Sequence, residues 1–369
     1  MSNKTKKAHE SLFYVTKRDS IPTVKAWAIR IAAVGFALVV CGLLTMLLTG
    51  ENPINVYASM IDGAIGTERR IWRLFQELAI LLCVSLAVTP AFKMKFWNIG
   101  AEGQVLMGGL ATAACMILFG NKLPTIALYP LIIVTSIAAG AIWAFIPAFF
   151  KAKWNTNETL FTLMMNYIAI QIVSYFTYIW SVPKGSGQIG VINASTKAGW
   201  LPAIGGSQYL INILIVAVLT FGMYIYLKYN KHGYELSVVG ESENTARYVG
   251  INVKKVIMRT MLLSGAVCGI AGLLLVAGTD HSIAKETVDG RGFTAIMVSW
   301  LAKFNPLTMI ITSFLIIFME RGAEQISSDF NVDPSISDIL TGIILFFIIG
   351  CEFFLQYKIV FNKNRKGAN

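Results

Sequence analysis

The chain has 369 residues, of which 55% are hydrophobic and only 14% are charged, and its mean hydropathy is +0.62. A water-soluble protein of this length has too little interior to bury so much apolar surface, so the composition excludes a set of soluble domains. Apolar stretches of about 20 residues, the length that a helix needs to cross about 30 Å of hydrocarbon, recur along the chain. We therefore predict an all-α, polytopic membrane protein.

The formal net charge of +11 does not require a nucleic-acid partner. Lysines and arginines in a membrane protein collect on the cytosolic side, and most of the 31 here do so if the N-terminus is inside. Residues 1–25 form a basic cytosolic tail without a cleavable signal peptide, and residues 357–369 form a second basic tail. Both termini are therefore predicted to lie in the cytosol.

About ten apolar stretches between these tails, within residues 26–356, are candidate membrane spans, and the eighth is plainly short. They cover residues 26–49, 71–92, 101–120, 125–150, 159–181, 208–228, 256–278, 292–302, 307–320 and 336–355. Residues 52–66 are too polar to span and are predicted to form an amphipathic helix on the outer surface. Residues 181–207, rich in proline, glycine and serine, are predicted to form a long external loop.

A weak internal repeat accompanies this pattern. Pro124 and Gly140 recur as Pro306 and Gly322, at an offset of 182 residues, and each pair bounds an apolar helix. The two helices are predicted to cross the membrane in opposite directions, and inverted repeats of this kind are typical of transporters. Chance coincidence in a chain with 31 glycines is the alternative.

The most informative stretch is polar where an apolar sequence is expected. It follows the second span and contains Trp97, Asn98, Gly100, Glu102 and Gln104. The apolar run after it is too short to cross the membrane alone, so these residues are predicted to lie partly at membrane depth. Backbone outside a helix is tolerated there only when it is buried in protein or lines a cavity. A substrate pocket is one interpretation, and an ordinary helix cap is the other.

A second polar group opens the fifth span. Asn157 and Glu158 precede Thr162 and Asn166, and the last three share one face of a helix. A carboxylate inside the membrane is costly enough to suggest a function. Because Lys153 is within one turn, the alternative is that Glu158 is simply a cap at the helix start, at the membrane interface.

The longest cytosolic loop, residues 229–259, contains a compact segment that runs from one glycine to another. Ser242 or Asn244 can cap a short helix there, and Gly250 can end it. A rigid helix between two spans is suited to dock into a cleft of another protein, with a solvated connector as the alternative. The residues predicted to make this contact, and so to couple the two proteins, are Glu241, Asn244, Ala246, Arg247 and Gly250.

Several kinds of chemistry are not expected in this chain. It has no GxxxxGK[ST] phosphate loop and no HExxH motif, and its three histidines have no apparent catalytic partner. The five cysteines lie in apolar stretches without CxxC spacing, so neither a disulfide framework nor a zinc site is expected. We expect a non-catalytic protein without a metal or a cofactor of its own.

These polar motifs resemble a known family. Residues 98–104, residues 157–169 and the run from Ala246 to Ile251 are similar to motifs in permease subunits of bacterial ABC importers for branched-chain amino acids and simple sugars. The nucleoside-type branch of that family is the most similar, and the resemblance extends over about residues 26–356. The sequence departs from the family pattern at Thr245 and at residues 289–293, which leaves the exact substrate open.

The resemblance implies a multi-pass permease of the bacterial plasma (inner) membrane, and it implies partners. These are a cytosolic subunit that binds ATP and Mg²⁺, a second permease subunit that is often a paralogue, and an extracellular substrate-binding lipoprotein. A nucleoside suits the polar motifs, because amides and carboxylates pair with ribose hydroxyls while a base stacks on Trp97 or Tyr167. Permeases for sugars or branched-chain amino acids, and an ion-driven secondary transporter, are the alternatives. The predicted substrate-binding residues are Trp97, Asn98, Gly100, Glu102, Gln104, Asn157, Glu158, Thr162 and Asn166.

Overall fold

A computed structural model describes residues 13–18, 22–50, 52–205, 207–331, 333 and 335–361 of the chain. The outer parts of both basic tails, residues 1–12 and 362–369, lie outside the described residues. The predictions made for these parts are therefore not tested.

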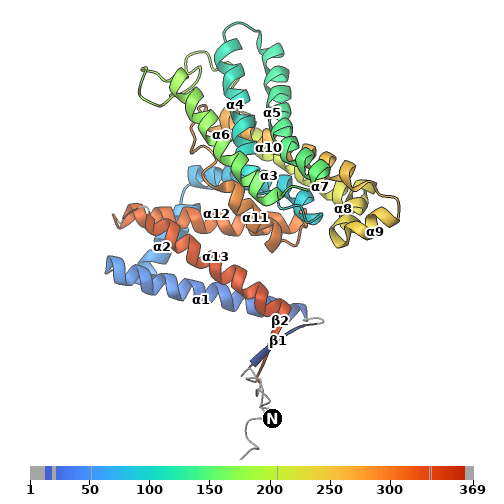
Figure 1. Ribbon diagram of the computed structural model, residues 1–369. Helices are drawn as coiled ribbons and strands as arrows, with labels where there is room; N and C mark the ends of the chain where they lie inside the picture. Colours follow the sequence, from blue (N-terminus) through green and yellow to red (C-terminus); the bar gives the residue numbers. More distant parts are fainter. Residues whose placement is uncertain are drawn as a thin grey trace, which may run out of the picture. The chain divides into compact units, whose positions relative to one another are not determined.

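The described chain is built from helices and one pair of short strands (Figure 1). The helices are α1 (Thr23–Thr49), α2 (Pro53–Ile65), α3 (Glu68–Lys93), α4 (Ala101–Phe119), α5 (Thr125–Trp154), α6 (Glu158–Trp180), α7 (Leu210–Tyr229), α8 (Lys231–Glu241), α9 (Glu243–Tyr248), α10 (Val253–Leu275), the π-helix η1 (Val276–Asp280), α11 (Arg291–Leu301), α12 (Pro306–Asp329) and α13 (Ser335–Gln356). The strands are β1 (Phe13–Lys17) and β2 (Tyr357–Phe361).

Nine of these helices, among the described residues, are long and apolar enough to cross a membrane. They correspond to nine of the predicted spans, and the short eighth prediction is α11, with only 11 residues. The prediction of an all-α, polytopic membrane protein is confirmed. The helix predicted to end at residue 320 instead continues to Asp329, because Ala323 and Ile326, one turn apart, are both buried. Hydropathy marks only the apolar part of such a helix.

Polar side chains at the helix starts explain several boundaries. The Thr67 hydroxyl accepts a hydrogen bond from the Arg70 backbone N–H at the start of α3, at 3.3 Å. The Asn252 side chain does the same for α10, where it accepts from the Lys255 N–H at 3.1 Å. Such caps satisfy N–H groups that lack a partner within the helix.

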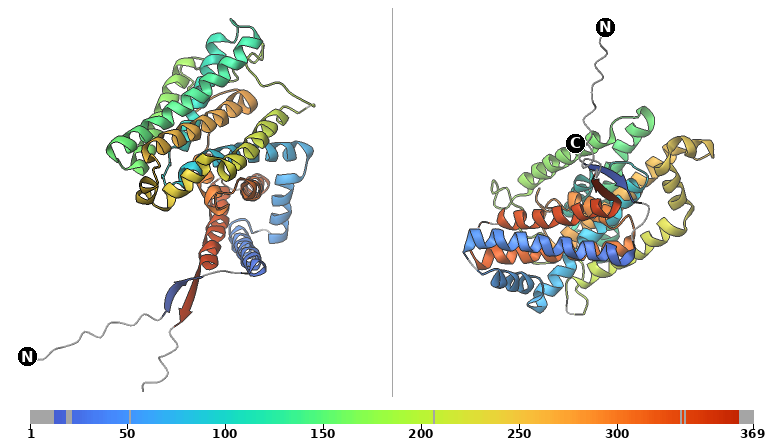
Figure 2. Two further views of the ribbon diagram at one scale, coloured as in Figure 1. Left: turned by 90° about the vertical axis from the view of Figure 1, so that its right-hand side faces the viewer. Right: turned by 90° about the horizontal axis from the view of Figure 1, so that it is seen from below.

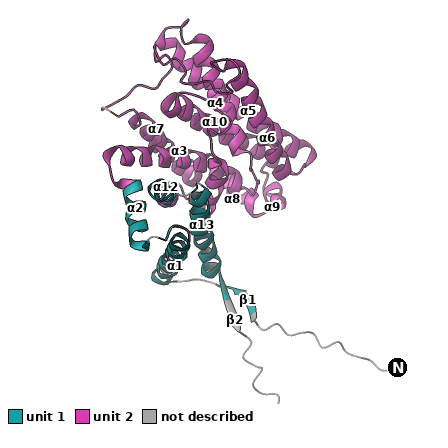
Figure 3. Ribbon diagram, turned by 90° about the vertical axis from the view of Figure 1, so that its left-hand side faces the viewer, with its two compact units in different colours: residues 1–64, 319–369 teal, residues 65–318 magenta. Residues whose placement is uncertain are grey.

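The chain divides into two compact units, residues 65–318 and residues 1–64 with 319–369 (Figure 3). In the smaller unit α1 packs along α13, and β1 pairs antiparallel with β2, so that Phe13 lies opposite Phe361 (Figure 2). These strand residues were predicted to belong to the two tails, and their pairing was not predicted.

Helix α2 was predicted to be amphipathic and to lie on the outer surface. It is a helix, but one of its faces is buried within the smaller unit. A Cβ atom built on Gly63 would come within 2.3 Å of the Gln325 side chain, and one on Gly322 within 2.3 Å of Met60. The two glycines let α2 pack closely on the second half of α12.

In the larger unit α10 is the central helix, and α3, α4 and α5 pack around it. Glycines allow the backbones of α4, α5 and α10 to touch: a Cβ atom on Gly140 would lie 2.3 Å from the Gly265 carbonyl oxygen. Likewise, a Cβ on Gly272 would lie 2.3 Å from the carbonyl oxygen of Val105. Small residues at helix contacts are the usual means of close packing inside membranes.

The proposed repeat unit can be located on these helices. Pro124 precedes α5 and Pro306 begins α12, and Gly140 and Gly322 lie inside the same two helices, each at a close contact. The two proline and glycine pairs therefore occupy corresponding places. The opposite orientation of the two helices in the membrane stays a prediction.

Candidate functional site

Residues Phe96–Gly100 connect α3 to α4 without helical structure, and Asn98 lies at the centre of this turn. Its side chain is fully buried. Its Oδ1 accepts hydrogen bonds from the Gly100 N–H at 3.1 Å and from Gln104 Nε2 at 3.0 Å. Its Nδ2 donates to Ser264 Oγ of α10 at 3.2 Å. Asn98 thus fixes the turn and joins it to the central helix.

Helix α6 supports the same turn from the other side. Asn166 Nδ2 donates to the Ile99 carbonyl oxygen, and its Oδ1 accepts from the Gly103 N–H, both at 2.8 Å. The Thr162 hydroxyl accepts from the Ile99 N–H at 3.2 Å and donates to the Glu158 carbonyl oxygen at 2.7 Å. The two polar motifs found separately in the sequence are therefore in direct contact.

The Glu102 carboxylate is buried and faces the start of α11. Its two oxygens accept hydrogen bonds from the Gly290 N–H at 3.0 Å and the Gly292 N–H at 2.8 Å. A Cβ atom on Gly292 would lie 2.6 Å from the Glu102 backbone nitrogen, so only glycine fits there. The carboxylate thus occupies the position of an anion at a helix N-terminus.

Glu158 forms an ion pair at the start of α6. Its Oε2 lies 2.8 Å from Lys151 Nζ near the end of α5, and both side chains are largely covered. Asn157 caps α6 by accepting from the Leu160 N–H at 3.2 Å. Lys153 was predicted to be the neighbouring cation, whereas the partner is Lys151.

Trp97 is exposed over 46% of its surface and stacks on Trp300 of α11, with ring centroids 5.7 Å apart. Phe92 meets Trp97 edge-on at 5.7 Å. Trp97 is the aromatic residue among the nine predicted substrate-binding residues, and nearly half of its surface is exposed. The amides and the carboxylate of the other residues are bound to the chain itself, so their contact with a substrate stays a prediction.

The predicted coupling segment forms a short helix, α9, and the earlier of the two candidate caps is the one used. Ser242 Oγ accepts from the Thr245 N–H at 3.3 Å, and Gly250 has a φ of +82°, which suits glycine after a helix. Ala246, expected to face a partner, is completely buried within the chain. Glu241 and Asn244 are exposed.

Two neighbours of Ala246 project from the loop instead. Tyr248 is 93% exposed, and the Arg247 side chain is 63% exposed and pairs with Glu243 at 3.2 Å. Tyr248 lies in the run from Ala246 to Ile251 that resembles a family motif, but it was not among the predicted coupling residues. An aromatic residue on a cytosolic loop is a recognisable signal, but sequence alone does not decide which side of a six-residue helix is buried.

Helix α8 fastens this segment to the spans. A Cβ atom on Gly240 would lie 2.2 Å from the Lys93 carbonyl oxygen, so α8 touches the end of α3. Glu235 Oε2 accepts from Arg259 of α10 at 2.6 Å. Burial raises the pKa of the Glu235 carboxyl, but the hydrogen bond and charge of Arg259 outweigh it and hold this pKa below its usual value.

A further polar cluster, absent from the sequence predictions, lies where α3, α7 and η1 meet. The Gln76 amide donates to the Thr279 hydroxyl, and Asn212 Nδ2 donates to Gln76 Oε1 at 3.2 Å. Asn212 is fully buried, and its Oδ1 has no hydrogen-bond partner among the described residues. The three residues lie far apart in the sequence, so only the spatial contact identifies the cluster.

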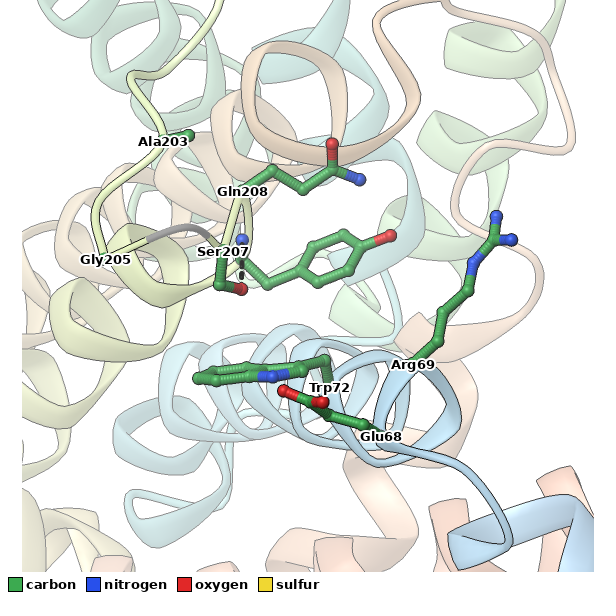
Figure 4. Close-up of a pocket in the computed structure, with 8 residues that line it drawn as sticks. Glu68, Arg69, Trp72, Ala203, Gly205, Ser207 and Gln208 are labelled. Atoms are coloured by element: carbon green, nitrogen blue, oxygen red, sulfur yellow. Dashed lines mark hydrogen bonds between the residues drawn. The ribbon is translucent and has the colours of Figure 1, made fainter.

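A cavity of about 670 Å³ lies between the first turn of α3 and the loop before α7. Figure 4 shows Glu68 and Trp72 on one wall, Ser207 and Gln208 on the other, and Arg69 at the side. Gln76 and Asn212 follow about one turn further along α3 and α7, respectively. The cavity therefore lies next to the cluster described above.

The sequence matches a family model over residues 71–349, and that model is described as the permease component of branched-chain amino acid transport systems. The guanosine ABC transporter permease protein NupP of Bacillus subtilis is 29% identical over 333 residues, covering 89% of this chain and 94% of the relative. The nucleoside ABC transporter permease protein NupB of Lactococcus lactis is 28% identical over 323 residues, covering 85% and 87%.

Two other similarities extend over most of the chain. The glucose ABC transporter permease protein TsgB13 of Haloferax volcanii is 26% identical over 361 residues, 95% of this chain and 94% of the relative. A solved structure of an inward-facing, metal-chelate type ABC transporter has 16% sequence identity and a TM-score of 0.45, covering 89% of this chain and 99% of that one.

Proposed function

The chain belongs to the family of permease components of branched-chain amino acid transport systems, and on this basis we propose that it imports nucleosides as part of an ATP-driven transporter. It is a multi-pass protein of the plasma (inner) membrane, with nine candidate membrane spans among its described residues. Its role in the transporter is that of the permease subunit, which forms the path through the membrane.

The choice of a nucleoside is supported by two relatives. Guanosine and nucleoside permeases match 89% and 85% of the chain, respectively, at 29% and 28% identity. A glucose permease at 26% identity keeps a simple sugar as the second candidate. An amino acid would require a fixed cation for its carboxylate, and lysine and arginine are lacking in the middle of the predicted spans.

Family membership implies an ATP-binding partner subunit on the cytosolic side. We place its contact on α9, where Arg247 and Tyr248 project from a helix that α8 fastens to α3 and α10. ATP and Mg²⁺ would bind in that partner, and this chain would be non-catalytic. A second permease subunit and an extracellular binding lipoprotein complete the proposed assembly.

Within the membrane, the nine predicted substrate-binding residues remain the proposed contacts. Trp97 offers an exposed indole on which a base can stack. Glu102 and Asn166 hold backbone groups of Gly292 and Gly103, so these bonds must be exchanged before either side chain can bind a ribose hydroxyl. The site would therefore form during the transport cycle.

The proposal is tested by reconstitution in proteoliposomes with the cognate ATP-binding subunit, second permease subunit and binding protein. Uptake of labelled guanosine, cytidine, glucose and leucine is measured with and without ATP. We expect ATP-dependent uptake of nucleosides only. Preferred uptake of glucose or leucine would reject the substrate class. Uptake by this chain alone, driven by an ion gradient, would reject the ATP-driven mechanism in favour of a secondary transporter.

A further inference from the structure

The exposed face of α6 differs from the exposed faces of the other described spans. Along the middle of α7 the most exposed side chains are apolar, with Val218 at 72% and Phe221 at 64%. On α5, Val134 and Ile142 are exposed at 64% and 62%. Such faces suit contact with lipid, since hydrocarbon tails tolerate apolar side chains.

On α6 the exposed face carries polar groups beside apolar ones such as Met164 and Ile168, from the middle of the helix towards its end. Tyr167 is 60% exposed, Tyr175 is 63% exposed, and Gln171 between them is also exposed. Successive members are four residues apart, so all three lie on one side of the helix. We call these three residues the α6 polar stripe. No hydrogen bond joins their side chains to any other described residue.

The opposite face of α6 is packed against α4 and α5 (Figure 1). It contains Asn166, which holds the turn before α4, together with buried residues one and two turns further on, Ala169 and Val173. Rotation of α6 would break that contact, so in this conformation the hydrogen bonds of Asn166 set the orientation of the stripe. The stripe faces away from the bundle of the larger unit.

Depth in the membrane decides what the stripe can face. At 1.5 Å per residue, Gln171 lies about 14 Å from the nearer end of α6, which places it near the centre of a bilayer of about 30 Å. Tyrosine is common at the interface but not at this depth, and a side-chain amide in hydrocarbon leaves its donors and acceptors unpaired. Polar residues inside the membrane almost always face a water-filled cavity or other protein.

We infer that the α6 polar stripe forms one wall of the water-filled path and contacts the nucleoside as it crosses. The inference rests on the proposed function for the identity of the substrate. The Tyr167 ring offers a face for a base, and the Gln171 amide offers both a donor and an acceptor for a ribose hydroxyl or a base edge. The stripe lacks charge, which suits a neutral substrate.

Cysteine accessibility tests this inference in the assembled importer. The five native cysteines are all buried, so an introduced thiol is the reactive one. Gln171→Cys is compared with Val218→Cys, which lies at similar depth on the apolar face of α7. The probe is a charged, membrane-impermeant methanethiosulfonate, applied with and without ATP.

We expect the probe to modify Gln171→Cys at least tenfold faster than Val218→Cys, and guanosine to slow only the former. Equal, slow rates at both positions in both conditions would overturn the inference and leave nucleoside import untouched. Fast modification that glucose slows and guanosine does not would keep the path but reject the proposed nucleoside.

A second pair of variants separates substrate contact from packing. Tyr167→Phe keeps the ring, and Tyr167→Leu removes it while leaving a side chain that suits lipid. We expect normal abundance of both, with at least tenfold lower guanosine uptake for Tyr167→Leu and a smaller loss for Tyr167→Phe. Unchanged uptake by Tyr167→Leu would mean that the stripe faces lipid.

Discussion

The Glu102 carboxylate accepts a hydrogen bond of 2.8 Å from the backbone N–H of Gly292, a residue 190 positions later in the chain. Glu102 is in the first turn of α4, and Gly292 is in the first turn of α11. One charged side chain therefore joins the beginnings of two helices. Because a helix N-terminus carries partial positive charge, the carboxylate is stabilised where it is buried.

Replacing this carboxylate by an amide should destabilise the protein. Glu102→Gln keeps the shape but turns an NH₂ group towards one of the two N–H donors. Hydrogen bonds to a charged group contribute about 1.5–3 kcal/mol, so we expect a lower melting temperature and lower membrane abundance. Thermal unfolding in detergent measures this, with Glu286→Gln, on an exposed residue nearby, as the control. A normal melting temperature with abolished uptake would indicate that the bonds to Gly290 and Gly292 add little to stability and that Glu102 acts mainly on the substrate.

Asn166 should be the residue of α6 that is least tolerant of truncation. Asn166→Ala leaves the Gly103 N–H and the Ile99 carbonyl oxygen without partners, and each buried unsatisfied group costs about 1–3 kcal/mol. Asn166→Asp retains the acceptor for the Gly103 N–H but turns a carboxylate oxygen towards the Ile99 carbonyl oxygen, so it should also lower the stability. Protease resistance of the purified permease reports the effect. Met164→Ala, on the exposed face of α6, is the matched control and should behave like the wild type.

Exchanging the charges of Lys151 and Glu158 distinguishes a structural role of the Glu158 carboxylate from a role in substrate binding. Lys151→Glu or Glu158→Lys alone places two like charges about 3 Å apart and should lower both stability and uptake. The double exchange restores the attraction, with an interaction free energy of about 0.5–3 kcal/mol. If uptake recovers together with stability, the pair is structural. Stability that recovers without uptake would show that a carboxylate is required at position 158.

Tyr248 should mediate coupling without supporting the fold. Because its side chain is 93% exposed, Tyr248→Ala should leave the melting temperature unchanged while reducing co-purification with the ATP-binding subunit and nucleoside-stimulated ATP hydrolysis. Ala246→Asp places a charge in a fully buried position and should destabilise the loop itself. Tyr234→Ala on α8, where the tyrosine is 67% exposed, is the control. Equal ATPase binding by Tyr248→Ala and the control would move the contact away from α9.

The Glu235 and Arg259 pair predicts a dependence of stability on pH. The folded-state pKa of Glu235 is lowered, so its stabilisation is complete above the unfolded-state value of about 4.3 and disappears as the pH falls through the folded value. Glu235→Gln should therefore lower the melting temperature at pH 7. It should have little effect at a pH below the folded-state pKa of Glu235. A melting-temperature difference that is independent of pH would contradict the assigned charge.

The sequence predicted the membrane spans because their apolar residues are contiguous, whatever they contact. It also predicted the polar motifs and the helix that Ser242 caps, since local spacing determines caps. It did not predict that Asn166 meets Gly103, or that Glu102 meets Gly292, because those contacts depend on how distant helices pack. Gln76 and Asn212 were missed for the same reason, since they are 136 residues apart and meet only through the packing of α3 and α7.

The direct backbone contacts among α4, α5 and α10 limit how this protein can change shape. Where a Cβ on Gly140 would lie 2.3 Å from the Gly265 carbonyl oxygen, the helices cannot slide without a clash, and separating them would open a void. These three helices should therefore move as a rigid body. Any alternation between outward-open and inward-open states must then use contacts that side chains mediate, such as the Lys151–Glu158 pair and the Asn166 bonds at α6.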